Sequence, residues 1–301
     1  MSPQLPRLFV AVPVFNEAQN LPGLFSGFRE IERQLRDRFA LHFLLVDDGS
    51  DDGTPEIARQ LSNDLTLDVI AHGTNLGPGT AFSSAFTRLS TVMAEGDWVI
   101  TMEGDNTSRH DLIRHMLRRA EEGFDAVFAS PYMYGGGFAH TSMLRRLLSS
   151  GANLVVKDML DVQGILTVSS FFRLYRAGAL LRLQAAFGPG IVERSGFESM
   201  VEMTMKMTML RVTISEVAMR LDSSLRKGKS KMKILRTIFG YIALWPRKGR
   251  WIKASNSVAK SDRAFSLRDQ SPPNTGGPTR QAIQYSSDRP ESAAENRSAK
   301  V

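Results

Sequence analysis

The sequence predicts an α/β protein with a doubly wound, mainly parallel sheet of the nucleotide-binding kind. Between residue 7 and about residue 130, short apolar segments typical of strands alternate with amphipathic segments of helical periodicity. Clusters of acidic residues follow three of these predicted strands. Such an alternation builds right-handed βαβ units, whose sheet is covered by helices on both faces. An amphipathic helix and a disordered tail are expected after this region.

Strands and helices are predicted in strict alternation. The first strand is apolar and β-branched, and the first helix places large apolar residues at helical spacing. Asn20 is the expected cap of that helix, and Pro22 lies in its first turn. The predicted strands are 8–14, 41–46, 67–71, 98–102 and 126–129, and the predicted helices are 21–39, 55–61, 80–93 and 110–122.

The composition excludes several classes of protein. A chain of 301 residues that is 42% hydrophobic can bury a full core. The absence of cysteine excludes a disulfide scaffold and a thiolate metal site, and it fits a reducing compartment. No segment approaches the roughly 20 apolar residues of a membrane-spanning helix, and the amino-terminal segment lacks the pattern of a signal peptide.

The basic residues are concentrated in one segment. The net charge is +7, and residues 224–253 include ten lysines and arginines but no acidic residue. This segment contains no recognised nucleic-acid-reading module, so no nucleic acid partner is expected. Residues 254–301 are rich in Ser, Asn, Gln and Pro and cannot offset their ordering entropy by burial. We therefore expect a main domain at 1–223, a basic segment at 224–253 and a disordered tail at 254–301.

Acidic side chains follow the first, second and fourth predicted strands. Glu17 follows the first, Asp47 and Asp48 follow the second, and Glu103 and Asp105 follow the fourth. Because the carboxyl ends of parallel strands share one edge of the sheet, these carboxylates should lie together, which is costly without a cation or polar ligand. Glu103 and Asp105 are separated by one glycine, so both could ligate one hard divalent ion. The alternative for the second cluster is a solvated turn before a helix.

A glycine-rich loop, residues 75–81, lies between these clusters. Gly77 and Gly79 allow the backbone to approach a ligand closely just before a helix begins. The alternative is that this loop only caps the helix at Thr80.

Six motifs in order resemble the family 2 inverting glycosyltransferases, above all the polyprenyl-phosphate sugar synthases of the dolichyl-phosphate mannose synthase type. The resemblance covers roughly residues 7–233. The motifs are VPVFNE (12–17), VDDGSDDGT (46–54), NLGPGTA (75–81), MEGDN (102–106), SSFFRLYR (169–176) and RKGKSKMK (226–233).

The resemblance implies a GT-A fold, a GDP- or UDP-linked sugar donor, a Mg²⁺ or Mn²⁺ cofactor and roles for individual residues. Residues 1–223 would then form the catalytic domain, and the basic segment would include a phosphate lid. The implied nucleotide-binding residues are Pro13, Asn16, Glu17, Asp47, Asp48, Gly77, Gly79 and Glu103; the metal ligands are Glu103 and Asp105; the acceptor-binding residues are Arg145, Arg146 and Ser149; the lid residues are Arg226, Ser230 and Lys231; and Asp105, Arg226 and Lys231 are catalytic.

The sequence departs from the family pattern near the acceptor. Glu103 replaces the first aspartate of the family's DxD motif, and Pro131 stands where the synthases carry an arginine. A lipid phosphate acceptor is already anionic and needs no general base, whereas a saccharide hydroxyl acceptor needs a carboxylate to take its proton. The candidates for that base are Asp161, Glu198 and Glu202. A nucleotide-sugar-binding protein that has lost its activity is a further alternative.

Residues 232–245 are expected to form an amphipathic helix at an anionic membrane surface. Basic residues flank its apolar face, and they include Lys248 and Arg250, whose charge reversal should weaken binding to the membrane. The alternative is an ordinary terminal helix that packs on the catalytic domain. We expect a cytoplasmic protein, peripheral at the cytoplasmic face of a membrane. The apolar face comprises Ile234, Leu235, Ile238, Tyr241, Ile242 and Trp245.

Overall fold

The computed structural model describes residues 5–140, 164–228 and 234–269 of the chain. Residues 1–262 form one compact unit, and a second unit begins at Arg263. The elements are β1 (Arg7–Val14), α1 (Leu21–Leu35), β2 (Ala40–Asp47), α2 (Thr54–Leu61), β3 (Leu67–Ala71), α3 (Pro78–Ser90), β4 (Trp98–Thr101), η1 (His110–Leu112), α4 (Ile113–Glu121), β5 (Ala126–Ser130), β6 (Gly137–Ala139), β7 (Arg173–Arg176), α6 (Ala177–Phe187), α7 (Ser199–Met209), β8 (Ile214–Ala218), β9 (Arg220–Asp222), η2 (Ser223–Leu225), α8 (Ile234–Ile242), η3 (Trp245–Arg247) and α9 (Lys248–Asp269).

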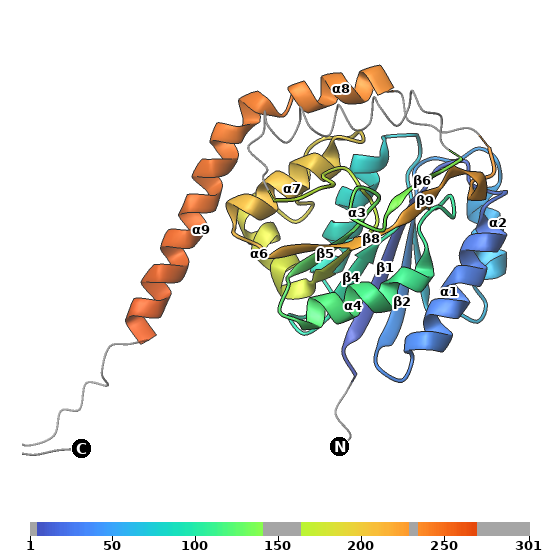
Figure 1. Cartoon of the computed structure of the whole chain (residues 1–301), viewed down its shortest axis with the longest axis horizontal. Coiled ribbons are helices and arrows are strands. Elements are labelled where there is room, and N and C mark those ends of the chain that lie inside the picture. The colour runs from blue at the N-terminus through green and yellow to red at the C-terminus, as the bar shows by residue number, and fades with distance from the viewer. Residues whose placement is uncertain (1–4, 141–163, 229–233, 270–301) are drawn as a thin grey trace, which may run out of the picture. The chain divides into compact units, whose positions relative to one another are not determined.

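Within the described residues, seven strands form the central sheet in the order β3-β2-β1-β4-β7-β5-β8 (Figure 1). Strand β7 is antiparallel to both of its neighbours, and the other neighbouring pairs are parallel. The predicted α/β class with a mainly parallel sheet is confirmed. The antiparallel direction of β7 was not predicted, because a four-residue strand carries no directional signal in its own sequence.

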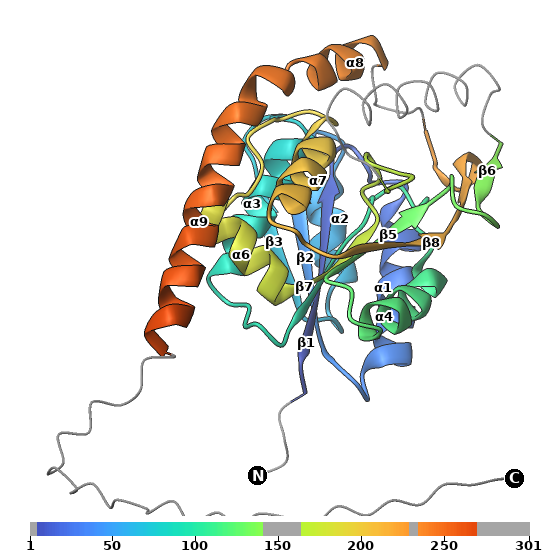
Figure 2. The ribbon, with the colours of Figure 1, turned by 60° about the vertical axis from the view of Figure 1, so that its left-hand side comes forward.

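Helices cover both faces of the sheet (Figure 2). Alternate residues of β1 divide between two hydrophobic cores, since successive side chains of a strand point to opposite faces. Leu8, Val10 and Val12 pack with α1, α2 and α4, whereas Phe9 and Ala11 pack with α3, α6 and α7. All residues from Ser199 to Met207 of α7 are buried, so its methionines serve packing.

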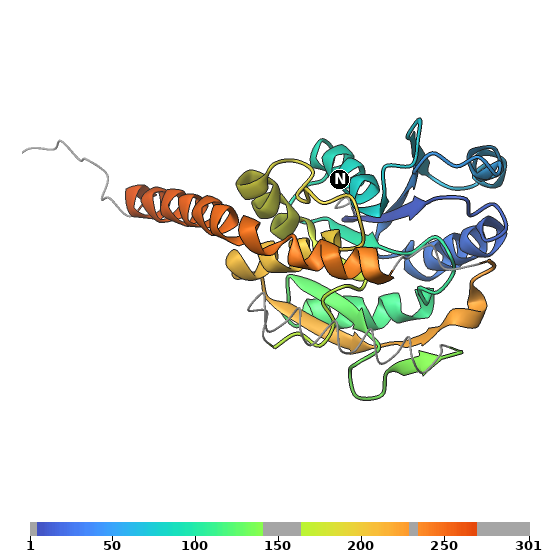
Figure 3. The same cartoon turned by 90° about the horizontal axis from the view of Figure 1, so that it is seen from above.

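The basic segment does not form a unit of its own. Tyr241, Leu244 and Trp251 belong to the core that contains α3, α6 and α7, so this segment is part of the compact unit. In Figure 3, the view from above, α8 lies nearest the viewer, in front of the sheet. The predicted membrane face is wrong at Tyr241, which is buried, while Ile242 and Trp245 are exposed.

The predicted start of the disordered tail is also wrong. Helix α9 continues to Asp269, and Ser255 is buried, so residues 254–269 are helical. The prediction underestimated the helical structure of this segment. Helical propensity and a few buried contacts suffice to form a helix here, although large apolar residues are scarce. Residues 270–301 lie outside the described part of the chain. In the part that is described, no helix is both long and apolar enough to cross a bilayer.

Candidate active site

The carboxyl ends of β1, β2 and β4 meet where the strand order of the sheet reverses. The register pairs Val14 with Asp47, and the backbone N–H of Asp48 donates to the carbonyl of Val14 at 2.8 Å. A pocket of about 1030 Å³ lies there, and Glu17, Asp48, Glu103 and Asp105 are among its lining residues. The predicted convergence of acidic strand ends at one edge of the sheet is confirmed.

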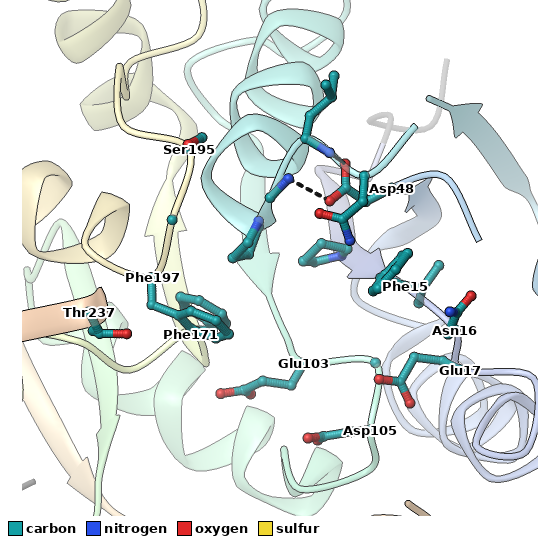
Figure 4. A pocket seen from close by; sticks show the side chains of 18 of the residues that line it. Phe15, Asn16, Glu17, Asp48, Glu103, Asp105, Phe171, Ser195, Phe197 and Thr237 are labelled. Carbon is teal, nitrogen blue, oxygen red and sulfur yellow. Dashed lines mark hydrogen bonds between the residues drawn. The ribbon is translucent and has the colours of Figure 1, made fainter. Parts of the chain in front are cut away.

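Asp48 is buried beside the pocket and fixes the glycine-rich loop. Its carboxylate accepts hydrogen bonds from the backbone N–H groups of Leu76 at 3.0 Å and Gly77 at 2.7 Å (Figure 4). The Nδ1 atom of His72 lies 2.8 Å from the same carboxylate, and its Nε2 atom lies 2.9 Å from the hydroxyl of Ser84. Asp48 therefore holds the loop before α3 against the end of β2.

Two predicted nucleotide-binding residues do not line the pocket. The carboxylate of Asp47 accepts a hydrogen bond from the hydroxyl of Ser50 at 2.5 Å and stabilises the turn after β2. The N–H of Gly79 donates to the carbonyl of Ser195 at 2.7 Å, and a Cβ atom at Gly79 would overlap the carbonyl of Arg194. The glycines predicted that a ligand would approach this backbone closely. At Gly79 the backbone of residues 194–195 makes that close approach instead, whereas Gly77 does line the pocket.

Pro13, Asn16 and Glu17, three of the predicted nucleotide-binding residues, line the pocket at the end of β1. Asn16 has a positive φ of 51°, and its side-chain carbonyl accepts from the backbone N–H of Asp51 at 2.9 Å. Glu17 accepts from the side-chain amide of Asn20 at 2.5 Å. The loop after β1 is therefore bonded both to the loop after β2 and to the start of α1.

Glu103 and Asp105 follow β4 and lie near each other at the bottom of the view in Figure 4. The carboxylate of Glu103 accepts a hydrogen bond from the hydroxyl of Ser108. The carboxylate of Asp105 accepts two hydrogen bonds from Thr107, one from its hydroxyl at 2.5 Å and one from its backbone N–H at 3.1 Å. Burial, followed by the neighbouring charge of Asp105, raises the pKa of Glu103 to about 7.

Arg226 forms an ion pair with Asp105 across 121 residues of sequence. Asn20 positions this arginine, because its side chain accepts from the N–H of Lys227 at 2.9 Å and donates to the carbonyl of Lys227 at 3.0 Å. Asn20 is the N-cap residue of α1, as predicted, but its side chain makes no capping bond to the helix and binds Lys227 instead. Ser230 and Lys231, the other predicted lid residues, lie outside the described residues.

The opposite wall of the pocket was not predicted. Phe171 and Phe197 are stacked, with ring centroids 5.5 Å apart and an interplanar angle of 6°. Thr237, Phe239 and Gly240 of α8 and the segment 194–198 complete this wall (Figure 4). Phe171 belongs to the SSFFRLYR motif and Glu198 was a candidate base, but isolated aromatic residues far apart in the sequence give no periodic signal that would join them into one wall.

The three candidate bases have different environments. Glu198 lines the pocket, is 6% exposed, and accepts from Arg194 Nε at 3.1 Å. Glu202 is fully buried and lies 2.6 Å from Lys206 Nζ, so its predicted candidacy as a base is wrong. Asp161 lies outside the described residues, as do the predicted acceptor-binding residues Arg145, Arg146 and Ser149.

The carboxylate pair fits a divalent ion that a diphosphate helps to coordinate. No group of three or more His, Cys, Asp and Glu side chains suited to a metal occurs in the described ranges. Glu103 and Asp105 would supply two oxygen ligands, and phosphate and water oxygens would supply the others. Asp105 already binds one cationic group, the guanidinium of Arg226.

Comparisons with known proteins agree with this geometry. The model of the family described as glycosyl transferase family 2 matches residues 9–183. A polyprenol monophosphomannose synthase from Mycolicibacterium smegmatis is 25% identical over 264 residues, covering 84% of this chain and 91% of that protein. A dolichol-phosphate mannosyltransferase from Pyrococcus furiosus is 28% identical over 261 residues, covering 84% of this chain and 67% of that protein.

Solved structures share the fold. Glucosyl-3-phosphoglycerate synthase from Mycobacterium tuberculosis in complex with Mn²⁺, uridine diphosphate and glucosyl-3-phosphoglycerate has a TM-score of 0.53 at 14% identity, covering 81% of this chain and 78% of that one. The complex of the same enzyme with phosphoglyceric acid has a TM-score of 0.54 at 13% identity, covering 83% of this chain and 80% of that one. The GT-A fold that the sequence motifs implied is confirmed.

Proposed function

Because the chain belongs to glycosyl transferase family 2, we propose that it is a metal-dependent, inverting glycosyltransferase that moves a sugar from a nucleotide-sugar donor to a polyprenyl phosphate. One observation carries the proposal: three acidic strand ends and a distant arginine converge on one pocket at the reversal of strand order. Ligands of open α/β sheets bind at this position. The names of the two curated relatives support the acceptor class.

The donor would lie along the carboxyl ends of β1, β2 and β4. Asn16, Glu17 and Asp48 would contact the nucleoside, because their carboxylate and amide groups suit ribose hydroxyls and base N–H groups, and Pro13 lines the pocket with them. Gly77 would let the loop approach the nucleotide closely.

The diphosphate would lie between Glu103, Asp105 and Arg226. A Mg²⁺ or Mn²⁺ ion bound by the two carboxylates would act as a Lewis acid that neutralises charge on the leaving diphosphate. The guanidinium of Arg226 is beside Asp105 and would donate hydrogen bonds to the same leaving group. Inversion requires the acceptor oxygen to attack the anomeric carbon from the side opposite the leaving diphosphate.

A saccharide hydroxyl acceptor is the second candidate, and Glu198 is the observation that favours it. Its carboxylate lines the pocket, where it could accept the hydroxyl proton. Glu198→Gln distinguishes the two acceptors. Transfer to a polyprenyl phosphate should retain most of its kcat, whereas transfer to a hydroxyl should fall by about a hundredfold or more.

We expect a nucleotide or nucleotide-sugar with Mg²⁺ or Mn²⁺ to raise the melting temperature, since a ligand that binds the folded state stabilises it by about 2.7 kcal/mol at one hundred times its Kd. The measurement is a thermal-shift panel of GDP, UDP and their mannose and glucose conjugates, each with and without metal. Transfer of radiolabelled sugar to a polyprenyl phosphate then tests turnover. Donor binding without any transfer would favour a binding protein that has lost its activity.

We also propose that the α8–α9 region contacts an anionic membrane from the cytoplasmic side. Phe239, Ile242 and Trp245 are 69%, 51% and 60% exposed, and they are spaced three residues apart, which puts them near one another on the surface. Phe239 also lines the pocket, so a lipid headgroup bound at this surface would be near the proposed acceptor site. Arg247 and Arg250 bind Glu193 and would therefore contribute less to lipid binding than the sequence predicted.

The double variant Ile242→Ser, Trp245→Ser should bind anionic liposomes at least about tenfold more weakly, because each lost apolar side chain contributes roughly 1.5 kcal/mol or more on burial. Binding of the unaltered chain should also weaken as salt screens its basic residues. The measurement is liposome co-sedimentation at low and high salt. Leu5→Ser, which alters an exposed leucine before β1, is the control and should bind normally. Equal binding of the double variant would contradict the proposal.

A further inference from the structure

One carboxylate connects the C-terminal helix α9 to the wall of the pocket. Glu193 Oε1 accepts from the indole N–H of Trp251 at 3.0 Å. Its other oxygen accepts from Arg247 at 3.2 Å and from Arg250. Trp251 is 1% exposed, so this contact has a buried, fixed anchor on α9 rather than surface charges alone.

Glu193 begins the wall segment, residues 193–198, whose last five residues line the pocket. The backbone N–H groups of Glu193 and Arg194 donate to the carboxylate of Glu202 at 2.8 and 2.9 Å. Glu202 in turn binds Lys206, whose Nζ atom lies 4.8 Å from the ring centroid of Trp251. Side chain and backbone of Glu193 are therefore held by the same buried group of residues.

The wall segment also contacts the glycine-rich loop. The carbonyl of Ser195 accepts from the N–H of Gly79, and the loop's Gly77 N–H donates to Asp48. Gly77 is packed so closely on the carbonyl of Ser195 that a Cβ atom there would overlap it. A displacement of the wall segment would therefore be transmitted to the loop that Asp48 holds.

We propose that Glu193 is a positioning residue through which α9 sets the wall segment of the pocket. Loss of its bonds to α9 leaves residues 193–195 restrained by the backbone bonds to Glu202 and by the bond between Ser195 and Gly79. The segment then opens more often, and the pocket wall loses its fixed position relative to the glycine-rich loop. The inference goes beyond the proposed function, and the first experiment does not depend on that function.

Hydrogen–deuterium exchange of the full chain tests the inference. Glu193→Gln removes the charge that Arg247 and Arg250 bind, and Trp251→Phe removes the indole donor but keeps an aromatic ring beside Lys206. In both variants the amides of residues 193–198 should exchange faster, on the order of tenfold, because hydrogen bonds to a charged group restrain local opening. Amides of β1 and β2 should be unchanged. Glu56→Gln, which removes an exposed ion pair on α2, is the matched control and should change nothing in this segment.

Unchanged exchange at 193–198 in both variants would overturn the inference, and so would an equal increase in β1 and β2, which would indicate global destabilisation. A second measurement is the Kd of UDP or GDP with Mn²⁺. In both variants the Kd should rise severalfold. If exchange becomes faster while the Kd stays unchanged, Glu193 has only a structural role and the proposal that it positions the pocket wall is overturned. If the unaltered chain binds no nucleotide, the proposed function fails, while the exchange experiment still decides whether α9 holds the wall segment.

Discussion

Asp105→Asn is expected to lower the kcat of sugar transfer by at least about a hundredfold, because the variant loses the negative charge that would bind the cation, and the cation would stabilise the leaving diphosphate. The asparagine can still accept from Thr107, and the site is at the end of a strand rather than in a hydrophobic core. The free energy of unfolding should therefore change by no more than about 1–2 kcal/mol. Steady-state kinetics and urea denaturation measure the two quantities.

Asp111→Asn is the matched control, since Asp111 lies in the same region of the chain. Its carboxylate pairs with Arg109 and does not line the pocket. The kcat of this variant should be normal. Glu103→Asp should have a milder effect and change the preference between Mg²⁺ and Mn²⁺, because the shorter side chain retains the charge. Near-normal turnover of Asp105→Asn would remove this residue from the proposed mechanism.

Glu202→Gln is expected to lower the free energy of unfolding by about 3–5 kcal/mol, because it leaves the ammonium group of Lys206 buried without its main counter-charge. Lys206 is fully buried and also donates to the carbonyl of Ile191 at 2.6 Å. Glu193, 3.6 Å from Lys206, is the other carboxylate near this group and is itself bound by α9. Urea denaturation measures the loss.

The double variant Glu202→Gln, Lys206→Met should recover part of that stability, since removing both charges leaves no uncompensated ion in the core. Asp64→Asn, which breaks an exposed ion pair with Arg29, is the control and should cost less than about 1 kcal/mol. A Glu202→Gln protein of normal stability that has lost its turnover would instead make Glu202 a base, contrary to its buried position.

The sequence was informative where the fold is built from local signals. Strand and helix periodicity located the elements of residues 7–130, and the parallel arrangement of strands made it possible to predict that Glu17, Asp48, Glu103 and Asp105 would meet. Asp47 shows the limit of this reasoning. Two adjacent aspartates have the same sequence signal, but the chain turns at the end of β2 and directs one to its own turn and the other to the pocket.

The sequence by itself determined the fold class, the family and the acidic edge of the sheet, because each depends on the order and spacing of residues along the chain. Only the tertiary structure decided the ion pair of Arg226 with Asp105, the role of Asn20 in holding Lys227, and the wall that α8 and residues 194–198 complete. These contacts join segments that are far apart in sequence. Which side chains meet across such distances depends on strand register and helix packing, which no local pattern encodes.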